Sequence, residues 1–443
     1  MAQAPEKIDP APLGRPLTFE FSGKTAKNRF MKAAMSELQS SWDDKDFAKR
    51  GIPSKELANL YRLWGAGGYG VILLGNTMIE YDQLEGVGNH IIPSEAPFSG
   101  ERFERFKDIA SAAKEHGSLV YTQLSHPGRQ VTDNIQPHPI SASDVQLKGS
   151  EFGSFAKPRA MEQADIDHVV NSFAHAAEYC YKAGFDGVEL HGAHGYLLAQ
   201  FLAPSTNLRT DQYGGSLTNR ARIIFEITDA IRARVPDKSF SIGIKLNSTE
   251  FQKGGFTVED CKVLCAELEK NNFDWVELSG GTYESLAFVH KRESTKKREA
   301  YFIEFAEMII PALKKTKVYI TGGLRTAAGM VKALEKMDGV GIGRPAAHEI
   351  DLPQKILDGV TDAAIKQLIS EDIFMITNAA ASIQMMLAGL GRQQLDLSRP
   401  DHEKVIQRAI EKWLGNRQKG GLPGPLYIEG LELQPYGTAY AAA

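Results

Sequence analysis

The sequence predicts a (β/α)8 barrel, one closed sheet of eight parallel strands alternating with helices, followed by a mainly helical C-terminal extension. Three observations support this. The 443 residues contain eight short runs rich in β-branched residues, and a helical pattern follows each run. Several runs are apolar throughout, as in parallel strands that are buried on both faces. Eight such units over roughly 330 residues suit one barrel with insertions, and a doubly wound open sheet is the alternative.

The expected elements follow in order. The predicted strands cover residues 29–35, 71–77, 119–125, 187–191, 240–247, 275–279, 318–322 and 340–343. The clearest helical patterns cover residues 103–116, 166–183, 258–271 and 300–314. The barrel domain therefore takes residues 1–360. The extension takes residues 361–443, with helical patterns at 367–387 and 402–413.

Residues 127–164 interrupt the alternation between the third strand and its helix. The segment is rich in Pro, Ser, Gly and charge. Loops of this length in compact domains are usually functional lids or disordered. Because this one follows the C-terminal end of a strand, we expect a lid over the active-site face of the barrel.

Composition narrows the class of protein. The net charge of -4 argues weakly against nucleic acid or an anionic membrane as a partner. The polar, Pro-rich N-terminus is unlike a signal peptide, and no apolar run reaches the length of a membrane span. We therefore expect a cytoplasmic protein. Cys180, Cys261 and Cys265 fall in helical patterns, and we interpret them as small buried residues rather than redox or metal groups.

The ends of the seventh and eighth strands predict a phosphate site. Both loops are rich in glycine, so that backbone N–H groups can approach an anion closely. Each loop also carries an arginine, Arg325 or Arg344, whose guanidinium can grip a phosphate with two hydrogen bonds. A helix is expected to start near Thr326, with its N-terminus towards the anion. The alternative is that the glycines only make tight turns and the arginines are solvated.

A second glycine run, residues 65–70, satisfies GxGxxG but follows a helix and precedes a strand. This is the reverse of the dinucleotide-binding order, so we interpret it as a helix end and a turn.

His191 and His194 form an HxxH pair at the end of the fourth strand. A metal site is disfavoured because no cluster of carboxylates accompanies the pair. Core histidines satisfied by the backbone are a second reading. The favoured reading is a pair of hydrogen-bond donors aimed at a substrate oxygen. Tyr196 follows two residues later and is a candidate proton donor, because a phenol is neutral at pH 7.

Taken together, the strand ends resemble the Old Yellow Enzyme family of NAD(P)H:flavin oxidoreductases. The most specific match is residues 185–220, FDGVELHGAHGYLLAQFLAPSTNLRTDQYGGSLTNR. Residues 27–29 (KNR), residues 123–129 (QLSHPGR) and the phosphate loops add to it. The resemblance covers about residues 16–360 and is closest to the thermophilic-like branch.

The resemblance implies an FMN-dependent ene-reductase that reduces the C=C bond of α,β-unsaturated carbonyl or nitro compounds. NADH or NADPH would be the reductant in a ping-pong cycle through flavin N5, and a homodimer would be consistent with the family. The implied flavin contacts are Ala33, Met35 and Ser36 near N5 and O4, Asn76, Gln123 and His191 around the ring, Lys245 near N1 and O2, and Gly323, Leu324, Arg325, Gly343 and Arg344 at the phosphate. His191 and His194 would hold the substrate oxygen, and Tyr196 or water would protonate the α-carbon.

Two residues depart from the family pattern. The family often has Arg where this chain has Lys245, which keeps the charge but loses the fork geometry. The thermophilic-like branch often has Cys where this chain has Ser36, so that tuning by a thiol is absent. Both departures concern the flavin potential and leave the reaction class unchanged.

Three rival functions remain at this point. A flavin-free isomerase or aldolase could use the same phosphate loops. A dienoyl-CoA reductase-like enzyme would need an iron–sulfur cluster, which three scattered cysteines do not provide. A non-catalytic FMN-binding barrel would not need Tyr196 and the full set of strand-end groups. Substrate choice depends on residues 127–164 and on loop residues such as Tyr283 and His290, while Arg292 and Arg298 are cofactor contacts or, more simply, solvated charge.

Overall fold

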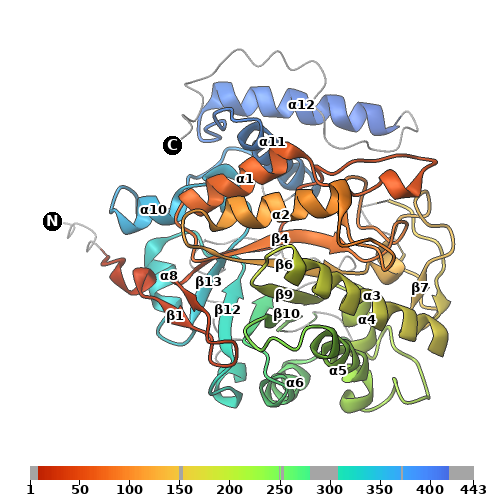
Figure 1. Ribbon diagram of the computed structural model, residues 1–443. Helices are drawn as coiled ribbons and strands as arrows, with labels where there is room; N and C mark the ends of the chain where they lie inside the picture. The colour runs from red at the N-terminus through yellow and green to blue at the C-terminus, as the bar shows by residue number, and fades with distance from the viewer. Residues whose placement is uncertain are drawn as a thin grey trace.

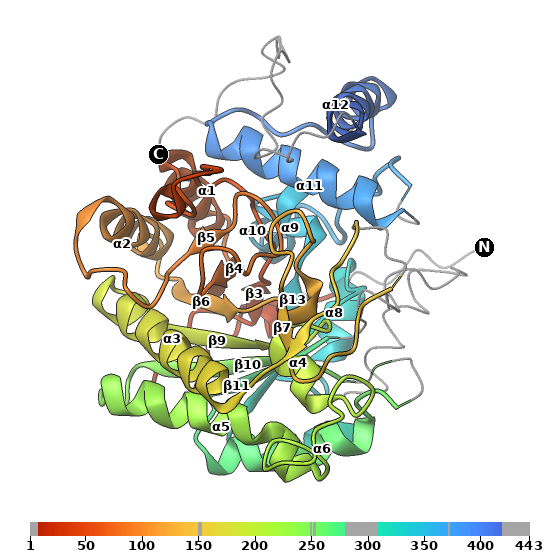
Figure 2. The same cartoon turned by 90° about the vertical axis from the view of Figure 1, so that its right-hand side faces the viewer.

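The computed structural model describes residues 8–148, 153–248, 250, 254–279, 308–370 and 373–418. In this part of the chain eight parallel strands close into a barrel (Figures 1 and 2). They are β3 (Phe30–Lys32), β4 (Val71–Met78), β6 (Leu119–Ser125), β9 (Gly187–Gly192), β10 (Ser241–Asn247), β11 (Trp275–Ser279), β12 (Lys317–Thr321) and β13 (Gly339–Ile342). Because β3 pairs with both β4 and β13, the predicted closed barrel is confirmed and the open-sheet alternative is wrong.

The strand predictions hold to within one or two residues except at the first strand. Residues 29–35 were expected, but β3 has three residues. The backbone N–H of Ala33 still donates to the Ile342 carbonyl oxygen at 3.0 Å, and the chain then leaves the ladder. The segment from Ala33 to Glu37 is therefore a loop on the rim of the barrel, where its groups can face a ligand.

Helices cover the outside of the barrel. They are α1 (Lys55–Ala66), α2 (Gly100–Lys114), α3 (Gln163–Lys182), α4 (Leu197–Leu202), α5 (Leu217–Arg234), α6 (Val258–Lys270), α8 (Ala327–Ala333), α9 (Arg344–His348) and α10 (Leu352–Leu357). Side-chain caps fix several starts; for example, the Thr326 hydroxyl accepts from the Gly329 N–H at 3.0 Å at the start of α8. Most of the predicted helix 300–314 lies outside the described residues. Its described end contains a short 3-10 turn, Ile310–Ala312.

The interpretations of the cysteines and of the second glycine run agree with the structure. Cys180, Cys261 and Cys265 are buried free thiols, and burial raises the pKa of Cys180 to about 12. Residues 65–70 end α1, and Gly68 turns the chain with a φ of +94°. The described residues contain no group of three or more His, Cys, Asp or Glu side chains arranged to hold a metal ion. None of the described helices has the length and apolar character that a membrane crossing needs.

An N-terminal hairpin closes the bottom of the barrel. It consists of β1 (Leu17–Thr18) and β2 (Thr25–Ala26). Beside it, Phe19 packs with its ring centroid 5.4 Å from that of Trp275 and 6.4 Å from that of Tyr319. All three rings are fully buried in one apolar layer. This end of the barrel is therefore filled by side chains, and a ligand would have to enter from the opposite mouth.

The C-terminal extension forms two helices, α11 (Phe374–Gly389) and α12 (Pro400–Gln418), stacked on the side of the barrel next to α1 (Figure 1). The predicted helix 367–387 was wrong at its start, since α11 begins at Phe374. The backbone before α11 makes tertiary hydrogen bonds instead of helical ones. The Ile365 N–H donates to the Glu349 carboxylate at 2.6 Å, and the Leu368 N–H donates to the Leu397 carbonyl oxygen at 2.9 Å. These contacts hold the segment in a non-helical conformation.

Candidate active site

The predicted phosphate loops lie side by side, because β12 and β13 are hydrogen-bonded neighbours. Gly322 and Gly323 have φ of +135° and +74°, which glycine adopts without strain. At Gly343, an added Cβ would meet no heavy atom of the described residues within 4 Å. The buried Thr321 hydroxyl has no hydrogen-bond partner among the described residues. An open backbone cradle with an unused hydroxyl fits a phosphate group.

The other predicted phosphate residues surround this cradle. Leu324 is buried, whereas Arg325 and Arg344 are half-buried at its edge. Arg344 begins α9 and donates from Nη1 to the Thr377 hydroxyl at 3.0 Å. The two arginines that were predicted from separate loops therefore follow strands that are hydrogen-bonded neighbours.

His191 and His194 meet at the barrel mouth. Nε2 of His191 lies 3.3 Å from Nδ1 of His194, and the ring centroids are 5.4 Å apart. Nε2 of His194 lies 3.0 Å from the Ser279 hydroxyl. His194 has a φ of +58°, an uncommon conformation for a residue with a side chain. Both imidazoles thus bond to polar side chains at the barrel mouth.

The tautomer of His191 follows from its neighbours. Asn76 donates from Nδ2 to the Glu85 carboxylate at 2.8 Å, so its Oδ1 is the atom 2.6 Å from Nδ1 of His191. A carbonyl oxygen only accepts, and Nδ1 of His191 therefore carries the proton. Ser125 also lies 3.2 Å from the same nitrogen, and its hydroxyl can donate or accept. Ser125 thus provides a partner for either tautomer.

Both imidazoles are neutral. Burial, the other histidine and the charge of Lys245 lower the pKa of His191 well below its usual value. Burial and Lys245 lower the pKa of His194 to about 3. Near pH 7 the pair consequently offers N–H donors and nitrogen acceptors without positive charge.

Tyr196 completes this cluster. Its ring centroid lies 4.5 Å from that of His191, and only 3% of the residue is exposed. The chain turns through Gly195, with a φ of +75°, and Tyr196 directly precedes α4. The structure therefore brings together the three side chains that were grouped from the sequence.

A buried pair of opposite charges lies beside the imidazoles, and the sequence predicted only one of its two members. Lys245 was predicted, but its partner Glu277 was not, and their Nζ and Oε1 atoms are 2.8 Å apart. Strand register explains the contact, because Lys245 pairs with His191 on β9 and with Glu277 on β11. A carboxylate inside an otherwise apolar strand was the available signal.

Glu189 is the second buried acid that was missed. Burial and the charge of Glu277 raise the pKa of Glu189 well above its usual value. Gln123 donates to one of its oxygens at 2.7 Å, and the Trp275 indole donates to the other at 3.2 Å. The amide of Gln123, a predicted ring contact, is therefore held in one orientation. Lys245 and Glu277 remain the charge-balanced pair.

The loop after β4 contributes a further acid at the rim. The Glu85 carboxylate accepts from the Ser36 hydroxyl and from Asn76, both of which were predicted to contact a flavin. Ala33 and Met35 lie on the same rim segment as Ser36. Nothing in the turn-rich sequence around Glu85 distinguished it from a solvated loop residue. Tyr283, His290, Arg292 and Arg298, also considered from sequence, lie outside the described residues.

A buried cluster around Glu37 fixes this rim segment to the barrel wall. Lys32 Nζ lies 3.3 Å from one carboxylate oxygen of Glu37, and His90 Nε2 lies 3.3 Å from the other. Tyr61 and the Gly75 N–H also donate to the carboxylate. Burial alone would raise the pKa of Glu37, but Lys32 and His90 outweigh it and lower the pKa to about 2.

We expect Glu37→Gln to flatten the acid side of the stability profile. The folded-state pKa of Glu37, about 2, lies below its usual value of 4.5. Its stabilisation is therefore complete above pH 4.5 and is lost as the pH falls towards 2. This contribution to the free energy of unfolding is roughly 3 kcal/mol. Urea unfolding of wild type and variant between pH 2.5 and 7 measures this, with the exposed Glu267→Gln as control. Parallel profiles for wild type and Glu37→Gln would contradict it.

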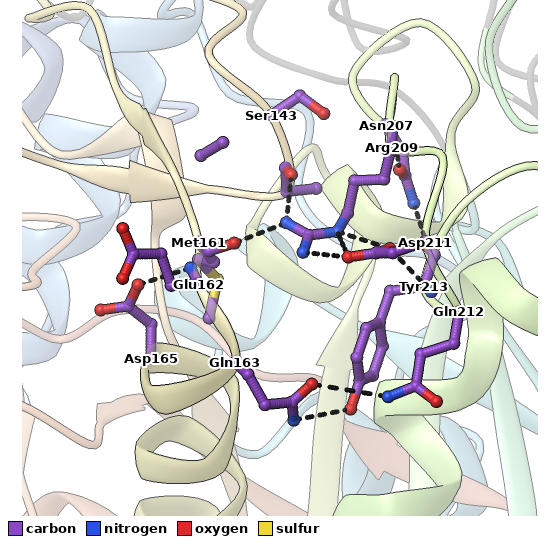
Figure 3. A network of polar contacts seen from close by, with 12 residues as sticks. Ser143, Met161, Glu162, Gln163, Asp165, Asn207, Arg209, Asp211, Gln212 and Tyr213 are labelled. Atoms are coloured by element: carbon purple, nitrogen blue, oxygen red, sulfur yellow. Dashed lines mark hydrogen bonds and ion pairs between the residues drawn. The ribbon is translucent and has the colours of Figure 1, made fainter.

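The insertion at residues 127–164 is anchored to the loop after α4. Two short segments within it form a two-strand ladder, β7 (Ile140–Ser141) and β8 (Arg159–Ala160). The Arg209 guanidinium donates to the Ala142 and Met161 carbonyl oxygens at 3.0 and 2.7 Å, the residues after each strand, and also to Asp211 (Figure 3). Gln130 of the insertion donates to the His194 carbonyl oxygen at 3.1 Å. The insertion therefore adjoins the site, where a lid was predicted.

The fold and these groups define a (β/α)8 barrel whose mouth carries polar side chains and a glycine-rich cradle that fits a phosphate group. The sequence profile of the NADH:flavin oxidoreductase / NADH oxidase family matches residues 12–363. The chain belongs to this family, the Old Yellow Enzyme family, as its strand-end motifs predicted. It is therefore an enzyme that uses a flavin and a nicotinamide nucleotide. This decides against the flavin-free isomerase or aldolase.

Two fungal relatives are similar over most of the chain. The NADH-dependent flavin oxidoreductase nadA of Aspergillus parasiticus is 48% identical over 94% of this chain and 94% of its own. The NADH-dependent flavin oxidoreductase iliE of Hypocrea jecorina is 32% identical over 76% of this chain and 86% of its own. Among solved structures, morphinone reductase is 25% identical over 81% of this chain and 92% of its own, with a TM-score of 0.65.

Proposed function

We propose that the protein is an FMN-dependent ene-reductase, which uses NADH or NADPH to reduce the C=C bond of an α,β-unsaturated carbonyl or nitro compound. The observation that carries the proposal is the neutral His191–His194 pair, 3.3 Å apart, with the Tyr196 ring beside it at the mouth of the barrel. Three relatives support a nicotinamide nucleotide as the reductant. The relatives nadA and iliE are named NADH-dependent, and morphinone reductase has been solved in complex with tetrahydroNAD.

FMN would be held by residues on three parts of the rim. Gly323, Leu324, Arg325, Gly343 and Arg344 would hold its phosphate, while Ala33, Met35, Ser36, Asn76, Gln123, His191 and Lys245 would surround its ring. When bound, FMN supplies the two-electron chemistry that takes hydride from the nicotinamide and gives it to the alkene. The positive charge of Lys245 would stabilise negative charge on the part of the ring that lies near it.

The chain's own residues bind and polarise the substrate. An oxygen atom that enters between the imidazoles takes a hydrogen bond from Nδ1 of His194 in place of the 3.3 Å contact to His191. His191 donates from Nε2 after its proton has moved there from Nδ1, and the Ser125 hydroxyl then donates to Nδ1 in place of the N–H bond to Asn76. Such donors stabilise the negative charge that grows on the oxygen as the β-carbon is reduced. The Tyr196 phenol is placed to protonate the α-carbon, with water as the alternative acid.

Anaerobic half-reactions test this proposal. FMN-loaded protein should be bleached by NADH or NADPH, and its visible absorbance should return when 2-cyclohexenone is added, with cyclohexanone as the product. Protein that is bleached by the nicotinamide but is not reoxidised by any activated alkene would refute the substrate class and leave the family membership intact.

A further inference from the structure

The loop that carries Arg344 is held from outside the barrel. α9 follows this loop directly, and two of its carbonyl oxygens accept hydrogen bonds from side chains outside the barrel. The Trp64 indole of α1 donates to the Ala346 carbonyl oxygen at 2.9 Å, and the Gln394 amide donates to that of Ala347. Trp64 is fully buried and Gln394 is 8% exposed. Hydrogen bonds from α1 and from the C-terminal extension thus hold the helix that follows the Arg344 loop.

The extension also reaches the cofactor arginine itself. Nη1 of Arg344 donates to the hydroxyl of Thr377, 3.0 Å away in the first turn of α11. Thr377 is fully buried. Figure 2 shows α11 running past α9 towards α1. An arginine at the edge of the phosphate cradle therefore has a fixed partner on a packed helix.

α11 is itself firmly placed. Asn59 of α1 donates from Nδ2 to the Gly389 carbonyl oxygen at 2.8 Å and to the Ala388 carbonyl oxygen at 3.3 Å. A Cβ at Gly389 would lie 2.9 Å from the Glu56 carbonyl oxygen, so the two helices approach too closely there for a side chain. Any group on α11 that faces α9 is consequently held at a fixed position relative to the barrel.

Holding an arginine before its ligand arrives raises affinity. A free guanidinium on a long side chain loses rotamer entropy when it grips an anion, and a partner that has already ordered it removes part of that loss. The guanidinium has five N–H donors, so one hydrogen bond to a hydroxyl is compatible with a bidentate contact to phosphate. Thr377 can therefore orient Arg344 without competing with the anion.

We propose that Thr377 is a positioning residue for the flavin phosphate, acting through Arg344, and that the C-terminal extension is thereby part of the cofactor site. The inference rests on the proposed FMN function. Thr377 lies beyond the family profile, which ends at residue 363. The similarity to nadA covers 94% of this chain, more than the profile's residues 12–363 contain, so that relative shares part of the extension.

Flavin titrations of the apoprotein test the inference. Thr377→Val keeps the shape but removes the acceptor, whereas Thr377→Ser keeps the hydroxyl. Thr228→Val is the matched control, because Thr228 is another buried helix threonine, whose hydroxyl donates to its own helix at 2.8 Å. Dissociation constants for FMN and for riboflavin, which lacks the phosphate, are measured by quenching of flavin fluorescence.

We expect Thr377→Val to weaken FMN binding by up to about tenfold, because the freed Arg344 side chain must then be ordered when the phosphate binds. Riboflavin affinity should not change, and Thr377→Ser and Thr228→Val should bind FMN like wild type. Equal FMN affinity in wild type and Thr377→Val would overturn the inference, as would an equal loss for FMN and riboflavin. If the valine variant does not fold, Thr377→Ala serves in its place. Wild-type protein that binds no FMN would overturn the proposed function as well.

Discussion

Replacing both imidazoles should reduce enone turnover more than any other change at the site. We expect His191→Ala and His194→Ala each to lower kcat/KM for 2-cyclohexenone about 10²-fold or more, the typical cost of removing one oxyanion donor. The double variant should also lose phenol binding, measured by calorimetry, while FMN stays bound. The reason is that the two neutral rings meet at 3.3 Å, where a substrate oxygen can enter between them.

A control separates this role from the general loss of a buried imidazole. His175→Ala removes a buried histidine of α3 whose Nε2 lies 3.0 Å from the Ala96 carbonyl oxygen, outside the site. Its turnover should equal that of wild type. Enone turnover that is unchanged in His191→Ala/His194→Ala would show that other groups hold the substrate oxygen.

The pH dependence gives a second view of the same pair. The pKa of His191 lies well below its usual value, and that of His194 is about 3. Neither ring changes its charge between pH 5 and 8, so the rate of enone reduction should show no ionisation near the usual histidine pKa, about 6.5.

Removing the Lys245 charge should have the largest effect on stability. Lys245→Met leaves Glu277, which is fully buried, without its counter-charge, and we expect a loss of about 3–5 kcal/mol in the free energy of unfolding. Adding Glu277→Gln should recover a large part of that loss, because the unpaired carboxylate is then gone. Urea unfolding of the apoproteins measures the cycle.

An exposed pair serves as the comparison. Lys270→Met breaks the contact to Glu267, where the side chains are 68% and 47% exposed, and should change stability by about 0.5 kcal/mol or less. If Lys245→Met and Lys270→Met lower the free energy of unfolding by equally small amounts, Lys245 and Glu277 do not act as a buried pair.

In the FMN-loaded protein, Lys245→Met should also lower the flavin midpoint potential, because the cation that favours the reduced, anionic form is lost.

The sequence predicted the parts of the molecule that depend on local pattern. Strands such as 119–125 and 275–279 were predicted with their observed bounds, because short runs rich in apolar and aromatic residues end there at clear breaks. Grouping His191, His194 and Tyr196 was also possible, since strand ends meet on one rim of a barrel. The same argument brought Arg325 and Arg344 together.

The sequence could not predict contacts that depend on register and tertiary packing. Glu277 faces Lys245 only because β10 and β11 pair with those residues opposite one another. Glu85 reaches Asn76 from a loop with no distinguishing pattern. The start of α11 was misplaced because residues 367–373 have helical character, whereas tertiary hydrogen bonds hold the backbone around Leu368 in another conformation.

One measurement tests the central claim most directly: a crystal structure of the protein saturated with FMN and phenol. The account predicts the phosphate against the backbone of Gly323 and Gly343 with Arg344 beside it, and the phenol oxygen between His191 and His194 above the flavin ring. Protein that takes up no FMN, or that binds it away from the barrel mouth, would contradict the account.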